Sequence, residues 1–226
     1  ENTDVVVDLV YDNPNASNAG GKDVADPRAI TVRIQHSIIA MPQNDYQPRR
    51  DDPRLGYFGQ QVNDMTSASA TNYRDVINRW HLVKQDPEAA ISEPVEPIVW
   101  WIENTTPHEF RDIIKRAGEM WNLAFEQAGF KNAVVMKVQP DSADWDAGDI
   151  RYNVLRWTSS PFPPFGGYGP SFVNPRTGQI LGADIMLEYV FVTNRIKQSA
   201  LYNNLGLLNL YDFDEDAGEH LAHDHG

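Results

Sequence analysis

The chain has 226 residues and a formal net charge of -13, because 32 Asp and Glu outnumber 19 Lys and Arg. Hydrophobic residues make up 41%, enough for one large domain or two small ones with a buried core, which excludes disorder throughout. The acidic balance argues against nucleic acid as the main partner, since phosphate binding needs clustered Lys and Arg. No apolar run approaches the roughly 18 residues of a membrane span, so no span is expected in this chain.

Cysteine is absent from the sequence. This absence excludes disulfides, cysteine nucleophiles, thiolate zinc sites and iron–sulfur clusters. The chain begins at Glu1 without a charged and then apolar leader. We therefore expect that it is cut from a longer protein and that any signal peptide or lipid anchor lies outside it.

The first ninety residues are predicted to be rich in β-strand. Residues 4–10 form a Val-dominated run. Farther along, Ile30, Val32 and Ile34 alternate with polar residues, which is the period of a half-buried strand. Residues 86–97 hold three Pro and three Glu, a composition typical of a linker. This segment places a predicted domain boundary near residue 92.

Residues 107–128 are predicted to form one long amphipathic helix. Thr106 at the N-cap, Pro107 at N1 and Glu109 at N3 have the pattern of a capping box. Gly129 supplies the expected C-terminal stop. Apolar residues then recur at the spacing of one helix face: Phe110, Ile113, Ile114, Ala117, Met120, Trp121, Ala124, Phe125 and Ala128.

Short apolar runs around this helix predict the strands of one sheet. A turn is expected at residues 174–178, where Pro175 fixes φ and Gly178 is free to take a positive φ. The expected fold is therefore α+β or α/β, a mixed sheet with one long packed helix that follows a β-rich N-terminal region. The predicted strands are residues 98–102, 133–138, 149–157, 168–173 and 179–190.

The candidate metal ligands are His220, His223 and His225, whose spacing suits a shared ion. They lie in an acidic tail without core residues, so a solvated tail is favoured and metal binding is the alternative. The acidic loop 141–149 has its glycine misplaced for a calcium loop, so a solvated turn is favoured there. Ser171 lies in no nucleophile elbow. No catalytic residue and no metal ligand is therefore assigned to this chain.

A set of motifs in the second half of the chain, taken in order, resembles a known family. It resembles the N-terminal subdomain of a bacterial family of large zinc-dependent metallopeptidases of the metzincin type. The residues upstream resemble the domain that precedes the peptidase in that family. The motifs of the preceding domain are Asp52 to Phe58 and Asn78-Arg79-Trp80. Those of the peptidase subdomain are Glu96 to Ile102, Trp121-Asn122, Ala128-Gly129-Phe130, Asp149 to Asn153, Tyr168 to Ser171, Pro175 to Gly178 and Ala183-Asp184-Ile185.

The resemblance implies three regions and a site for substrate. Residues 1–91 are the C-terminal part of a β-rich preceding domain, 92–190 a metzincin-like subdomain without its zinc helix, and 191–226 an insertion or tail, partly mobile. In such folds a short edge strand lies along the cleft and pairs with an extended peptide or protein substrate. An ordinary sheet edge, in which Pro170 merely discourages aggregation, is the alternative. The implied substrate-binding residues are Tyr168, Gly169, Pro170, Ser171 and Phe172.

The sequence departs from the family at the zinc motif. His-Glu-x-x-His-x-x-Gly-x-x-His is absent, since Glu219-His220 reverses the order and His220 to His223 is one residue short of the required spacing. The resemblance therefore implies the front of a zinc peptidase, inactive alone, with zinc in the full-length parent and none in this chain. The expected partner is the missing C-terminal catalytic part, and the expected location is periplasmic, outer-membrane-anchored or extracellular.

Two rival functions stay open at this stage. A non-catalytic module that binds peptide or glycan would use exposed aromatic side chains as contact residues. Packing of these side chains under a loop is the competing interpretation. A pseudo-enzyme that has lost its zinc helix is the other rival. The aromatic residues concerned are Trp157, Phe162, Phe165, Tyr168 and Phe172.

Overall fold

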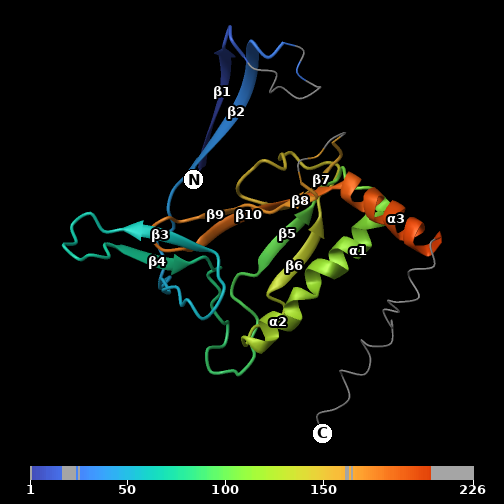
Figure 1. Ribbon diagram of the computed structural model, residues 1–226. Helices are drawn as coiled ribbons and strands as arrows, with labels where there is room; N and C mark the ends of the chain where they lie inside the picture. The colour runs from blue at the N-terminus through green and yellow to red at the C-terminus, as the bar shows by residue number, and fades with distance from the viewer. Residues whose placement is uncertain (1, 17–23, 25, 161–162, 164, 205–226) are drawn as a thin grey trace. The chain divides into compact units, whose positions relative to one another are not determined.

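The computed structural model describes residues 2–16, 24, 26–160, 163 and 165–204. The fold is mixed α+β, with a mixed sheet and a long helical segment packed on it, as the sequence predicted (Figure 1). The chain forms two compact units, each described by itself below. Unit 1 comprises Glu1–Arg79 and Asn174–Gln179, and unit 2 comprises Trp80–Val173 and Ile180–Gly226.

Unit 1 contains two antiparallel hairpins. Strands β1 (Asn2–Asp12) and β2 (Ala29–Ile39) pair along their whole length, which confirms the two strands predicted from the Val-rich run and the alternating pattern. Strands β3 (Gly59–Asn63) and β4 (Tyr73–Ile77) form the second hairpin. Cross-strand side-chain pairs stabilise such ribbons, and the Asp8–Arg33 ion pair, 2.7 Å between Oδ1 and Nε, is one of them.

A turn from the second half of the chain completes unit 1. The Gly178 N–H donates to the Asn174 carbonyl oxygen at 2.9 Å, and the Arg79 N–H donates to the Gly178 carbonyl oxygen at 3.0 Å. Gly178 has φ of +78°, a conformation that costs little for glycine and more for any other residue. The turn predicted at residues 174–178 is therefore confirmed.

Unit 2 is built on one mixed sheet. The strand order is β6 (Val134–Val138), β5 (Ile98–Ile102), β7 (Asn153–Thr158), β10 (Ile180–Glu188) and β8 (Gly167–Tyr168). Strands β6, β5, β7 and β10 are parallel, whereas β8 and the short β9 (Ser171–Val173) pair antiparallel with β10. Parallel strands need crossover connections, and α1 and α2 supply the one between β5 and β6.

The predicted long helix is present as α1 (His108–Glu119) and α2 (Trp121–Gln127), which meet at Met120. The predicted capping box is wrong by one position: Pro107 is the N-cap residue and no side chain caps the helix. Thr106 is instead buried, and its carbonyl oxygen accepts from Arg111 Nε at 2.8 Å. At the other end, Gly129 has φ of +88°, which confirms the predicted C-terminal stop.

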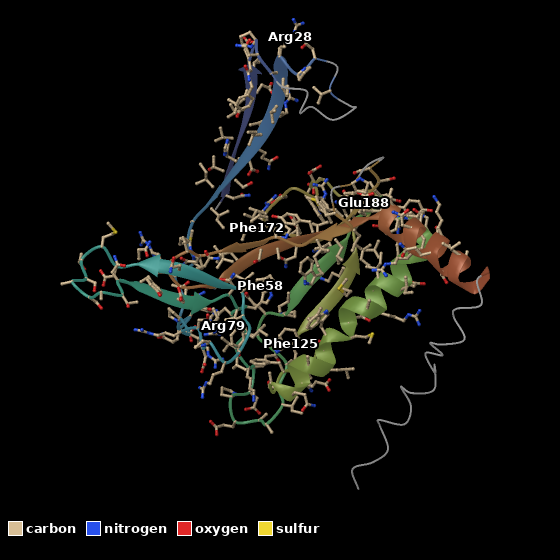
Figure 2. All side chains as sticks on the ribbon, in the orientation of Figure 1. Arg28, Phe58, Arg79, Phe125, Phe172 and Glu188 are labelled. Atoms are coloured by element: carbon tan, nitrogen blue, oxygen red, sulfur yellow. The ribbon has the colours of Figure 1, made fainter. Side chains whose placement is uncertain are left out.

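The core of unit 2 lies between this helical segment and the sheet. Ile102, Val134 and Met136 form its buried cluster, and Phe125 of α2 packs against them (Figure 2). Asn122 fastens the helix to β6, because its side-chain amide donates to the Val134 carbonyl oxygen at 2.9 Å and accepts from the Val134 N–H at 2.8 Å. These two hydrogen bonds fix the position of α2 along β6.

Two predicted strands have different bounds in the structure. Residues 149–152 form a turn rather than the start of β7, because the Asp149 carboxylate accepts hydrogen bonds from the backbone and side chain of Arg151. Strand β10 ends at Glu188, and α3 (Tyr189–Asn204) begins at the next residue. No helix in the described residues is long and apolar enough to cross a membrane.

The Pro- and Glu-rich segment 86–97 lies in unit 2. The Lys84 ammonium group donates to the carbonyl oxygens of Ala89 and Ala90, each at 2.8 Å. Ser92 is buried, and its N–H donates to the Gly129 carbonyl oxygen at 3.1 Å. The boundary near residue 92 stays a prediction, whereas the compact units divide between Arg79 and Trp80.

Substituting Gly178 with Ala should destabilise unit 1 by at least about 1–2 kcal/mol, the cost of a left-handed conformation for a residue with a Cβ. A Cβ there would also overlap the Ile77 carbonyl oxygen. Gly56→Ala is the matched control, because a Cβ at Gly56 meets nothing within 4 Å. It should change the free energy of unfolding by less than about 1 kcal/mol. Equal effects of the two variants on the free energy of unfolding in denaturant titrations would contradict the role given to the positive φ of Gly178.

Candidate functional site

The five residues predicted to bind substrate lie together at one edge of the unit 2 sheet. Strand β8 places Tyr168 opposite Met186 of β10, and β9 places Ser171 opposite Ala183. Gly169 and Pro170 join the two short strands. The sheet ends at this antiparallel pair, which is therefore its edge.

The backbone hydrogen bonds reveal which main-chain groups of the edge face outward. The carbonyl oxygens of Gly166 and Pro170 point toward β10, because they accept from the N–H groups of Glu188 and Asp184 at 3.3 and 3.0 Å. In an antiparallel strand, alternate residues direct their N–H and C=O to opposite sides. Gly167, Gly169 and Ser171 therefore present their main-chain groups away from the sheet. All three are exposed.

The side chains at this edge divide between exposed and packed positions. Tyr168 is 53% exposed, and its ring lies 5.8 Å from that of Phe165, which is 40% exposed. Phe172 is partly buried, with its ring next to Gly182. The edge therefore offers exposed backbone flanked by one exposed aromatic pair.

The predicted aromatic cluster is not a single cluster among the described residues. Trp157 stacks on Phe110 of α1 with ring centroids 5.1 Å apart, and Tyr189 lies 5.5 Å from it. Trp157 pairs with Leu187, whereas Tyr168 pairs with Met186. Because neighbouring residues of β10 point to opposite faces, Trp157 and Tyr168 lie on different faces of the sheet. Phe162 lies outside the described residues.

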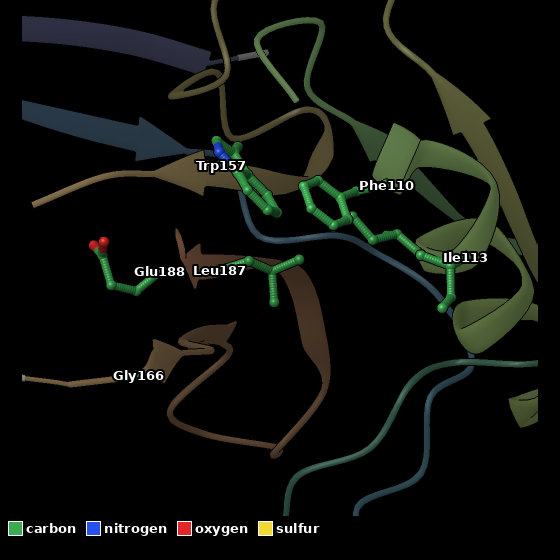
Figure 3. A pocket seen from close by; sticks show the side chains of 7 residues that line it. Phe110, Ile113, Trp157, Gly166, Leu187 and Glu188 are labelled. Atoms are coloured by element: carbon green, nitrogen blue, oxygen red, sulfur yellow. The ribbon is translucent and has the colours of Figure 1, made fainter. Parts of the chain in front are cut away.

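An apolar pocket of about 290 Å³ opens between α1 and strands β7 and β10. The stacked rings of Phe110 and Trp157 form part of its lining (Figure 3). Sequence periodicity gave no signal for this pocket, because it depends on which strands α1 leaves uncovered. Its lining residues are Phe110, Ile113, Ile114, Trp157, Gly166, Leu187 and Glu188.

Glu188 fixes the end of β10 and was missed by the sequence analysis. The residue is 3% exposed. Its carboxylate accepts from the Ser160 N–H and from the Thr158 hydroxyl, each at 2.9 Å. The Ser160 N–H is the largest cause that lowers the pKa of this carboxyl below its ordinary value. The sequence signal was a single acidic residue at the end of an otherwise apolar strand.

Asp184 lies four residues before Glu188 in β10. The pKa of its carboxyl is shifted in the opposite direction from that of Glu188. Its Oδ1 accepts from the Val154 N–H at 3.2 Å. Burial raises the pKa of this carboxyl, against the lowering influence of Val154 and Arg156. Arg156 Nη2 also lies 3.6 Å from Glu103 Oε1. These side chains connect Glu103, the residue after β5, with strands β7 and β10. None of the three side chains is a nucleophile or belongs to a group that could hold a metal ion.

The residues do not fit a zinc site within the described part of the chain, where no group of three or more His, Cys, Asp or Glu could hold a metal ion. In the acidic loop, Asp146 Oδ1 accepts from the Gly148 N–H at 2.7 Å. That carboxylate caps a turn, which agrees with the favoured interpretation of the loop. His220, His223 and His225 lie outside the described residues.

Glu188→Gln should lower the stability of unit 2 at pH 7, because both carboxylate oxygens accept hydrogen bonds and the amide nitrogen that replaces one of them cannot accept. A carboxyl with a depressed folded-state pKa stabilises the fold above its unfolded pKa, near 4.5, and loses that stabilisation as the pH falls through the folded-state pKa. The difference between variant and wild type should therefore shrink below pH 4.5.

The measurement is denaturant unfolding from pH 7 to pH 3, followed by tryptophan fluorescence. Glu126→Gln is the control, because Glu126 is an exposed residue of α2. It should produce a small difference at every pH. A stability difference for Glu188→Gln that is constant or grows toward low pH would contradict the role given to this carboxylate.

Comparison with known proteins finds similarity to one protein family in the first part of the chain. The profile of a family described as "Domain of unknown function (DUF5117)" matches residues 1–85. No curated protein and no solved structure matches the chain. The β-rich first part of the chain is therefore similar to that family, whose description assigns no activity.

Proposed function

We propose that this chain is the non-catalytic front of a zinc-dependent metallopeptidase and that unit 2 supplies the edge on which the peptide substrate lies. The observation that carries the proposal is the outward main chain of Gly167, Gly169 and Ser171 at the β8–β9 edge. An extended peptide can add to such an edge as one more strand.

The chemistry of this edge suits peptides of varied sequence. Main-chain hydrogen bonds hold an added strand without reading its side chains. The two glycines place no side chain beside the substrate backbone, so an extended chain can approach closely. Tyr168 and Phe165 offer an exposed aromatic surface next to it. These features favour a protein or peptide substrate over a small molecule.

The order of elements in unit 2 also supports the proposal. The metzincin resemblance requires a strand, a long helix, further strands, a short edge strand and a last strand before the zinc helix. Strands β5, β6, β7, β8 with β9, and β10 follow that order, with α1 and α2 after the first. Zinc would supply the Lewis acid for peptide hydrolysis in the parent protein. No described residue is given a role in holding it.

The proposal places the parent protein in the periplasm, on the outer membrane or outside the cell. A chain without cysteine is compatible with an oxidising compartment. The partners in the proposal are a peptide or protein substrate and a C-terminal catalytic part of the same protein.

A non-catalytic peptide-binding module is the second candidate, because the same edge and the exposed Phe165–Tyr168 pair would serve it equally. The two candidates differ in turnover. A module would bind peptide saturably and release it unchanged, whereas a peptidase would cleave it.

The chain extended through its native reading frame beyond Gly226 should hydrolyse casein, and a zinc chelator should abolish the hydrolysis. The 226-residue chain should hydrolyse none, because no described residue group fits a metal site. The measurement is release of peptides from casein by both proteins at equal concentration, with and without chelator. Chelator-sensitive hydrolysis by the 226-residue chain would refute the proposal, as would an inactive extended chain that binds zinc.

Ser171→Pro should lower kcat/KM of the extended chain for casein by roughly 3- to 10-fold, the worth of one main-chain hydrogen bond. The substitution removes an outward N–H, a position at which an edge strand tolerates proline. Ser171→Ala is the matched control, because it removes the hydroxyl and keeps the N–H.

The control should stay within about twofold of wild type if the main chain of Ser171, and not its hydroxyl, contacts the substrate. Thermal unfolding of both variants should match that of the parent chain, since Ser171 N–H faces away from β10. An equal loss of activity in both variants, or no loss in either, would argue against substrate pairing at this edge.

A further inference from the structure

The hairpin of β1 and β2 in unit 1 (Figure 1) carries most of its apolar side chains on one face. The strands pair without a register shift, and directly paired residues of an antiparallel ribbon lie on the same face. Side chains alternate between the two faces along each strand. The apolar ribbon face, as it is called below, therefore consists of Thr3, Val5, Val7, Leu9, Tyr11, Ile30, Val32, Ile34, His36 and Ile38.

The charged residues of the hairpin lie on the other face. Asp4, Asp8, Asp12 and Arg33 all occupy the alternate positions. Their interactions stay on that face, where Arg33 Nε donates to Asp8 Oδ1 and the Ser37 hydroxyl donates to Asp4 Oδ1, each at 2.7 Å. The apolar ribbon face has no Asp, Glu, Lys or Arg. One face of the hairpin is therefore suited to water and the other to an apolar neighbour.

The apolar ribbon face is not covered within the described part of unit 1. No described residue of the hairpin is buried, and Val5, Tyr11 and Ile38 are 43%, 57% and 60% exposed. A hairpin of two strands is only marginally stable in water, and it gains independent stability from a further strand or a layer packed on its apolar face. The period-2 pattern of the sequence, typical of a half-buried strand, thus indicates a partner for this face.

A second copy of the same face suits this chemistry. A charged or hydrogen-bonding partner surface would lose its water against the apolar ribbon face and find no polar group to replace it. The same face of another copy brings no charged residue into the contact. The Asp and Arg side chains of both copies point away from it. Because charges separated by more than about 8 Å are largely screened at physiological ionic strength, the net charge of -13 does not prevent the contact.

The area of the face is sufficient for a dimer. Each strand has 11 residues, so the ribbon is roughly 37 Å long and, with its side chains, roughly 15 Å wide. Two such faces would together bury about 1,100 Å², which exceeds the roughly 1,000 Å² expected of a specific interface. Two sheets pack with aligned strands about 10 Å apart. Two ribbons can therefore form a small sandwich, in which each supplies the layer that the other needs.

We propose that this chain forms a two-fold symmetric dimer in which the apolar ribbon faces of two copies pack on each other. A two-fold interface uses the same patch on both copies. Val7 and Ile34, the middle pair of the face, therefore lie at the centre of the interface. The dimer is closed, because each copy has one such face and the contact occupies it. The proposal does not rest on the proposed function, whose substrate edge lies in unit 2.

Val7 and Val6 provide matched test positions, because they are neighbours in β1 and lie on opposite faces. Sedimentation equilibrium of the 226-residue chain should show a monomer that converts to twice its mass as the concentration rises. Val7→Lys places a charge in the interface and should raise the dissociation constant by at least about tenfold. Val6→Lys adds the same charge to the polar face and should change the dissociation constant by less than about threefold.

The absence of cysteine permits a second test that puts no charge on the ribbon. Val7→Cys and Val6→Cys each introduce one thiol, and circular dichroism first establishes that both variants are folded. A bismaleimide with a reach of about 10 Å, the spacing of packed sheets, should join two copies of Val7→Cys. It should not join two copies of Val6→Cys, whose thiols lie on the outer faces of the sandwich.

Four results would overturn the proposal. The first is a chain that stays monomeric at every concentration. The second is a dimer that both lysine variants weaken equally, since another surface would then hold it. The third is slow maleimide labelling of Val7→Cys in a monomer, which would identify a segment of the same chain as the cover. The fourth is a chain extended upstream of Glu1 through its native reading frame that stays monomeric where the 226-residue chain dimerises. This result would overturn the proposal for the parent protein and assign the face to an upstream segment.

Discussion

The pairing of β10 on both of its sides is the constraint on which unit 2 depends. On one side β10 is parallel to β7, and on the other it is antiparallel to β8 and β9. The parallel pairing joins β10 to the strands that α1 and α2 cover. The antiparallel pairing with β8 and β9 forms the edge of the sheet. The hydrogen bonds of Asp184 and Glu188 to the edge orient the edge strand, and so decide which of its main-chain groups face outward.

Buried and partly buried polar side chains hold the ends of these elements in place. Glu188 ties the end of β10 to the end of β7, Asn122 ties the helix to β6, and Arg111 ties the helix start to the loop before it. Each is hydrogen-bonded to backbone groups or to a hydroxyl, which offsets the desolvation cost of removing a polar atom from water. Burial of the apolar core drives the folding of unit 2. The polar contacts determine how the helix and the strands are aligned with one another.

Local sequence signals predicted the elements that depend on local physics. The alternation of Ile30, Val32 and Ile34 predicted a strand, and Gly129 and Gly178 predicted backbone at positive φ. All three rest on side-chain period or on the missing Cβ of glycine, which act within a few residues. The fold class followed from the order of these elements.

Other predictions from local sequence were wrong because the features concerned depend on tertiary structure. The predicted capping box is wrong because the helix begins at His108, which makes Pro107 and not Thr106 the N-cap residue. The aromatic cluster failed because strand pairing sends Trp157 and Tyr168 to opposite faces. The candidate edge was predicted by resemblance to a family, but the outward direction of the Ser171 main chain and the apolar pocket beside α1 depend on strand register and helix placement.

The central claim is that this chain is the front of a zinc peptidase whose substrate lies along the β8–β9 edge. The most direct measurement is to sequence the native reading frame past Gly226. The account predicts His-Glu-x-x-His-x-x-Gly-x-x-His downstream, in a segment predicted to be helical. A stop codon, or a continuation without that motif, would contradict the account and leave a peptide-binding module or a pseudo-enzyme.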